Sequence, residues 1–124
     1  MLSVTFNGES HPVKSIEQFG AALDHFNDSK QFEMWVSLED GPSMCMLRNG
    51  DNSWLMYLRF AGDNGFVSRG NPDAIGSASY VLSNDQVDEY PLSWCIDIEQ
   101  CYKAMAYFFV NNGAMPSWVS WHES

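Results

Sequence analysis

Between residues 32 and 68 the sequence alternates apolar and polar side chains in short runs that are separated by tight-turn signals. The strand-like runs are 32–39, 44–47, 54–60 and 66–68, and the turn signals are Asp40-Gly41-Pro42, Asn49-Gly50-Asp51-Asn52 and Asp63-Asn64-Gly65. A period of two places successive side chains on opposite faces of a strand. Turns this short join antiparallel neighbours, because a parallel pair needs a long crossover. The region therefore predicts an antiparallel meander.

Two stretches on either side of the meander have helical periodicity instead. Apolar residues recur every three or four positions between residues 16 and 26, directly after Ser15, whose hydroxyl is a favoured N-cap. The same spacing returns between residues 98 and 109, directly after Asp97. Two helices are therefore predicted, and Gly113 is predicted to end the second one as its C′ residue.

Further segments extend the predicted sheet. Residues 2–6 alternate, residues 80–82 could return to the sheet, residues 90–96 are extended, and residues 117–121 alternate once more. We expect an α+β fold, in which an antiparallel sheet of about five to seven strands carries two helices on one face. A chain of 124 residues has the length of one domain, so a single domain is expected over residues 1–124.

Three residues near the C-terminus are assigned to the fold. Gly113 suits a left-handed helix cap, and Pro116 prevents the helix from resuming. Trp121 is expected to fill the core between the sheet and the helices. If Trp121 is buried, its replacement by Ala destabilises the protein by an amount on the order of 3–5 kcal/mol.

The charge balance restricts the partners that the protein can have. Sixteen acidic residues face six basic ones, which gives a formal net charge of −10. Nucleic acids and anionic membranes are polyanions and should repel such a chain. A basic protein should attract it, so no nucleic-acid or membrane partner is expected. Acidity can also serve solubility alone, and charge by itself does not name a partner.

Cysteine usage and the N-terminal sequence indicate a compartment. Cys45, Cys95 and Cys101 form no CxxC pair, and an odd number of cysteines without metal spacing is typical of reduced thiols. The first residues lack the basic and apolar regions of a signal peptide. No apolar run is long enough to cross a bilayer. A cytoplasmic protein is therefore expected.

Catalytic and metal-binding signatures are not found in the sequence. His11, His25 and His122 are isolated, and no pair of ligands has the spacing of a metal site. No nucleophile motif such as GxSxG is present. We therefore expect no enzyme activity, no metal and no cofactor. Trp35 and Trp54, together with Trp94, could line a ligand pocket, although such residues more often fill a core.

The C-terminal half resembles a known family in several segments. They are Gly65-Phe66-Val67-Ser68-Arg69-Gly70-Asn71-Pro72, Ala104-Met105-Ala106-Tyr107-Phe108-Phe109, Asn112-Gly113-Ala114-Met115-Pro116 and Trp118-Val119-Ser120-Trp121-His122-Glu123. In this order they resemble the Imm1 type of immunity protein from polymorphic-toxin systems, with Trp121 at the position of the family's C-terminal Trp. The resemblance implies an α+β protein that neutralises a cognate secreted bacterial toxin, whose chemistry is that of a nucleic-acid deaminase or nuclease.

The resemblance also implies how inhibition is achieved. A toxin that acts on nucleic acid has a basic substrate site, which an acidic inhibitor can occupy in a 1:1 complex with the toxin's C-terminal domain. The residues expected to contact the toxin are exposed acids at turns, Glu39, Asp40, Asp85, Asp88 and Glu89, together with Asp63 and Arg69, which flank the central loop. The alternative is a small-molecule-binding or regulatory domain that uses an aromatic-lined pocket.

Overall fold

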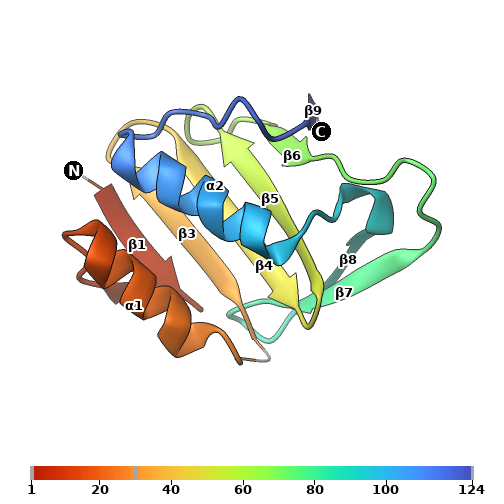
Figure 1. Ribbon diagram of the computed structural model, residues 1–124, viewed down its shortest axis with the longest axis horizontal. Coiled ribbons are helices and arrows are strands. Elements are labelled where there is room, and N and C mark those ends of the chain that lie inside the picture. Colours follow the sequence, from red (N-terminus) through yellow and green to blue (C-terminus); the bar gives the residue numbers. More distant parts are fainter. Residues whose placement is uncertain (1, 30, 124) are drawn as a thin grey trace.

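The computed structural model describes residues 2–29 and 31–123, and an antiparallel sheet with the strand order β2-β1-β3-β4-β5-β6-β9 forms its centre (Figure 1). Its strands are β1 (Leu2–Phe6), β2 (Glu9–His11), β3 (Glu33–Leu38), β4 (Ser43–Asn49), β5 (Asn52–Leu58), β6 (Phe66–Ser68) and β9 (Trp121–Glu123). Strands β3 to β6 are consecutive neighbours, so the predicted meander is confirmed. Strand β2, which pairs with β1 across the Asn7-Gly8 turn, was not predicted.

Two helices, α1 (Ile16–Phe26) and α2 (Ile98–Val110), cover one face of this sheet, as predicted (Figure 1). The Ser15 hydroxyl caps α1 by accepting a hydrogen bond of 3.1 Å from the Gln18 N–H. The Asp97 carboxylate caps α2 by accepting from the Glu99 N–H at 3.1 Å. The core between helices and sheet contains Val4, Phe6, Phe19, Leu23, Phe32, Met34, Val36, Met44, Met46, Leu55, Tyr57, Cys101, Ala104, Met105, Phe108 and Val119.

A separate hairpin of β7 (Ser77–Val81) and β8 (Val87–Pro91) covers part of the opposite face of the sheet. The expected return of residues 80–82 to the main sheet is therefore wrong. The β4 and β5 strands present apolar side chains on that face, and Ala78 and Tyr80 of β7 bury them. The backbone of β7 meanwhile pairs with β8. The second core contains Cys45, Leu47, Trp54, Val67, Ala78 and Tyr80. Residues 90–96 are not continuously extended, because a 3-10 turn, η1 (Leu92–Trp94), follows β8.

The end of α2 differs from the prediction by one residue. Asn112, with φ 52°, takes the left-handed C′ position, and Gly113, with φ 86°, follows it and donates a 2.9 Å hydrogen bond to the Phe108 carbonyl. Glycine is nevertheless favoured there, because φ is positive and a Cβ at Gly113 would lie 2.4 Å from Leu38 Cδ1 and 2.8 Å from Pro42 Cγ. This close approach fixes the end of α2 against the β3–β4 turn.

The C-terminal segment crosses the end of the sheet and adds its last strand. Predicted at residues 117–121, this strand is β9 and begins only at Trp121. Pro116 is buried, and its carbonyl accepts a 3.0 Å hydrogen bond from Trp121 Nε1. Trp121 is half-buried at the margin of the helix-side core. Replacement of Trp121 by Ala should therefore cost less stability than the roughly 3–5 kcal/mol expected for a fully buried tryptophan.

Candidate functional site

The predicted acidic contact residues lie at opposite ends of the main sheet. Glu39 and Asp40 occupy the β3–β4 turn, and Asp63 lies in the neighbouring β5–β6 loop; we call residues 39–42 and 59–65 the turn end. Asp85 lies at the tip of the β7–β8 hairpin, near the opposite end of β3, where the Ser83 N–H donates to Glu33 Oε1 at 2.9 Å. The acids therefore form two surfaces rather than one.

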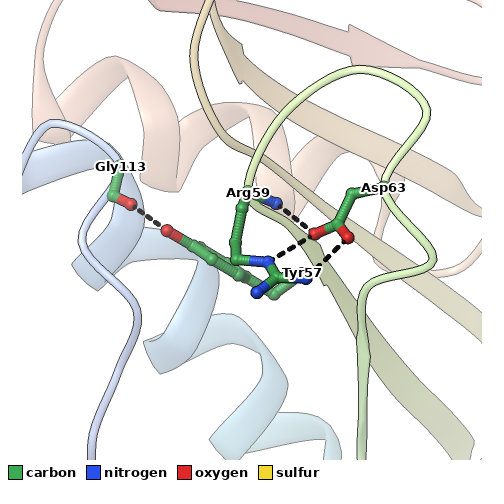
Figure 2. Close-up of polar contacts among 4 residues, drawn as sticks. All are labelled: Tyr57, Arg59, Asp63 and Gly113. Atoms are coloured by element: carbon green, nitrogen blue, oxygen red, sulfur yellow. Dashed lines mark hydrogen bonds and ion pairs between the residues drawn. The ribbon is translucent and has the colours of Figure 1, made fainter. Parts of the chain in front are cut away.

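Within the turn end, Asp63 is held by the arginine of its own loop. Its carboxylate accepts hydrogen bonds from Arg59 N at 3.0 Å, Arg59 Nε at 2.8 Å and Arg59 Nη2 at 2.9 Å (Figure 2). The Asp63 side chain is only 4% exposed. The side-chain hydrogen bonds from Arg59 hold the pKa of the Asp63 carboxyl well below its usual range. Asp63 therefore closes the β5–β6 loop, and its charge is already paired.

The turn end is also tied to the end of α2. The Tyr57 hydroxyl, which reaches from β5, donates a 2.8 Å hydrogen bond to the Gly113 carbonyl (Figure 2). Burial raises the pKa of Tyr57 above its ordinary value. The loop at residues 59–65 and the segment after α2 are thus anchored to the same strand.

Tyr57→Phe tests this anchor. The substitution removes one hydroxyl and leaves the buried Gly113 carbonyl without its donor, so we expect the protein to lose about 1–2 kcal/mol of stability. Urea denaturation followed by tryptophan fluorescence measures the loss. A midpoint equal to that of the wild type would show that the hydrogen bond contributes nothing to stability.

The acids of the β7–β8 hairpin differ in their exposure and in their hydrogen bonds. Asp88, which was expected to be exposed, is half-buried and accepts from Gln86 Nε2 at 2.6 Å and from the Tyr90 hydroxyl at 3.1 Å. Burial, together with the hydrogen bond to Asp88, raises the pKa of Tyr90 to about 12. Glu89 is exposed, with one long contact of 3.4 Å from the Ser79 hydroxyl, and Asp85 is exposed at φ 66°. Asp85 and Glu89 therefore face solvent, whereas the Asp88 carboxylate is hydrogen-bonded within the hairpin.

A shallow groove lies beside the acids of the turn end. It consists of a hollow of about 350 Å³ that includes Ser3 and Glu39, and a hollow of about 410 Å³ that includes Asp40 and Ser43; the two share Ser37 and Leu38. The strand register aligns Ser3, Ser37 and Ser43 in one row. The sequence shows these residues as polar positions of three strands, but only the register reveals the row.

Arg69 shares its hollow with none of the predicted acids. It follows β6 and lines a hollow of about 310 Å³ together with Pro72, Ser93, Trp94 and His122. Trp94 and His122 were not predicted as its neighbours, because they lie far from it in the sequence.

Of the three tryptophans that could line an aromatic pocket, Trp54 is a core residue. Trp54 is 2% exposed and packs against Tyr80, Tyr90 and Trp94, so it fills the second core. A hollow of about 630 Å³ elsewhere includes Leu2, Val13 and Phe109 in its lining and no tryptophan. Trp54 therefore serves packing, whereas Trp94 also lines the hollow beside Arg69.

The described residues offer little for covalent or metal chemistry. In residues 2–29 and 31–123, no group of three or more His, Cys, Asp or Glu side chains is arranged to hold a metal ion. Burial raises the pKa of the Cys101 thiol to about 12 and that of Cys45 well above its ordinary value. These two thiols are therefore poor nucleophiles. No helix in this part of the chain is long and apolar enough to span a membrane.

The chain is similar to a known protein family. The family model described as Immunity protein Imm1 matches residues 7–123 and so covers nearly the whole chain. This agrees with the resemblance of the C-terminal segments and extends it to the N-terminal half. No curated protein matches the chain.

Proposed function

The chain belongs to the Imm1 family of immunity proteins, and on that premise we propose that it binds and neutralises a cognate secreted bacterial toxin in the cytoplasm. The toxin acts on nucleic acid, as a deaminase or a nuclease, and the immunity protein covers its basic substrate site in a 1:1 complex. The family match over residues 7–123 carries this proposal.

The distribution of charge supports a basic partner. Six acids and no Lys or Arg lie between residues 70 and 102, which include the hairpin, and the whole chain has a net charge of −10. A surface of one sign attracts a surface of the other and speeds diffusional encounter. The same field opposes binding of the chain itself to nucleic acid.

Four of the predicted contact acids are available to such a partner. Glu39, Asp40, Asp85 and Glu89 are exposed, and in the described part of the chain none of them forms a salt bridge. A basic partner can therefore approach these carboxylates without breaking an internal ion pair. Asp63 and Asp88 contribute to the field, but their direct use would compete with Arg59 and Tyr90.

Co-expression is the first experiment. The toxic C-terminal domain encoded beside this gene is expressed with and without the immunity protein, growth is scored, and the complex is sought by co-purification. We expect rescue of growth and a stable 1:1 complex. Failure of both, with two folded proteins, would contradict the proposal for that pair.

A matched pair of double variants locates the surface that is used. Glu39→Gln/Asp40→Asn changes the turn end, and Asp85→Asn/Glu89→Gln changes the hairpin. Each removes two charges, and Asn tolerates the positive φ of Asp40 and Asp85. We expect both to slow association with the toxin by a similar factor, roughly several-fold at low salt, because steering acts at long range.

Dissociation distinguishes the two surfaces, because only residues in contact with the toxin affect it strongly. The double variant that lies in the interface should also dissociate faster, as measured by surface plasmon resonance. Association rates that remain at the wild-type value in both variants at low salt would contradict electrostatic steering by these acids.

A further inference from the structure

Arg69 is held in place by its backbone on two sides. Its N–H donates a 2.9 Å hydrogen bond to the Ser120 carbonyl, in the segment before β9. The next N–H, that of Gly70, donates at 2.7 Å to the Ser93 carbonyl in η1. The hollow beside Arg69 is thus built where three segments, distant in sequence, are fixed to one another.

Among the three arginines, Arg69 alone has a side chain without a partner in the described residues. Arg48 donates to the Gly50 carbonyl at 3.0 Å and to the Tyr102 hydroxyl at 2.8 Å. Arg59 is paired with Asp63. Arg69 is exposed, and no described residue accepts a hydrogen bond from its guanidinium. Its five donors are available to a ligand.

The other groups in the hollow suit an anion of small size. None of the lining residues is acidic, although the chain has sixteen acids. The rings of Trp94 and His122 lie with centroids 5.3 Å apart and form an aromatic wall. A guanidinium binds a carboxylate through two parallel hydrogen bonds, and a volume of about 310 Å³ admits a single side chain.

We propose that the hollow formed by Arg69, Pro72, Ser93, Trp94 and His122 receives a carboxylate side chain of the toxin, an inference that rests on the proposed function. A nucleic-acid phosphate is disfavoured, because a chain of net charge −10 repels a polyanion. Arginine and tryptophan are the residue types enriched at interface hot spots. The exposed acids then set the rate of encounter, and Arg69 sets the lifetime of the complex.

Three single variants test the lifetime. Arg69→Gln removes the charge and the two parallel donors, and Arg69→Lys keeps only the charge. Lys103→Gln removes an equal charge from the exposed side of α2 and serves as the matched control. With the toxin domain as ligand, we expect Arg69→Gln to dissociate roughly tenfold faster or more, Arg69→Lys to recover part of this, and Lys103→Gln to dissociate as the wild type does. Wild-type dissociation of Arg69→Gln would overturn the proposal.

A second measurement needs no toxin and separates this inference from the proposed function. The wild-type protein is titrated with aspartate blocked at both termini, and the Trp94 indole resonance is followed by NMR. We expect a shift that is absent in Arg69→Gln and absent with blocked asparagine. No shift with blocked aspartate, or a shift only with inorganic phosphate, would overturn the carboxylate assignment. If the wild type fails to bind the toxin while this shift is present, the proposed function fails and the site remains.

Discussion

Gly70→Ala is expected to destabilise the protein by about 3 kcal/mol or more, above the usual range for an overpacked residue. A Cβ at this position would lie 1.9 Å from the Cys95 carbonyl oxygen and 3.3 Å from the Ser93 carbonyl oxygen. The contact is with backbone, so no side chain can rotate away. The neighbouring segment is itself fixed, because the Ser68 hydroxyl donates to the Trp94 carbonyl at 2.7 Å. A shift of the backbone at residues 93–95 to make room for the Cβ would therefore also cost stability.

Gly20→Ala is the control for this substitution. Nothing lies within 4 Å of a Cβ at Gly20, which is in the middle of α1. Ala is a better helix former than Gly, so we expect a gain of about 0.5–1 kcal/mol. Urea denaturation of both variants measures the difference. An unfolding midpoint of Gly70→Ala equal to that of the wild type would show that residue 70 does not pack closely against residues 93–95.

Trp54→Ala is expected to cost about 3–5 kcal/mol, the range for loss of a large buried aromatic side chain. The Trp54 ring packs between the sheet and the hairpin, 4.6 Å from the Tyr90 ring and 6.2 Å from that of Trp94 by centroid. Its removal leaves a cavity under β7 and β8, which pair with no other strand in residues 2–29 and 31–123. Amide hydrogen exchange in the hairpin should therefore accelerate more than exchange in β3 and β4.

Trp54→Phe separates loss of packing from loss of the indole N–H. Trp54 Nε1 is buried and has no hydrogen-bond partner among the described residues. Its removal therefore breaks no hydrogen bond, and a ring still fills most of the space. We expect a loss below about 1.5 kcal/mol. A loss equal to that of Trp54→Ala would mean that the indole N–H has a partner that stabilises the fold.

The exposure of the turn acids could be predicted from the sequence, but their arrangement in space could not. Exposed acids are recognisable because they stand in turn sequences, and Glu39, Asp40, Asp85 and Glu89 are indeed exposed. Pairing was not recognisable for Asp63 and Asp88, because it depends on how the β5–β6 loop directs Arg59 and on how Tyr90 is directed along β8. The hollow beside Arg69 depends on contacts between residues 69–72, 93–94 and 122, which no local pattern connects.

The features that could be predicted from the amino-acid sequence are those that depend on neighbours along the chain. Alternation and turn residues fix the meander from β3 to β6, and the periodicity after Ser15 and Asp97 fixes both helices and their starts. These features are local, because side-chain period and capping involve only a few consecutive residues. The family resemblance had the same origin, in short segments read in order.

The packing of the remaining segments depends on contacts that form only in the folded protein. Residues 77–91 form a hairpin on the second face because apolar side chains of β4 and β5 lie uncovered there, and burial of that face outweighs extension of the sheet edge. Gly113 and Gly70 lie against segments from distant parts of the sequence, and these segments leave little room for a Cβ. Burial and close contact are properties of the assembled fold, so a pattern of period two or 3.6 does not contain them.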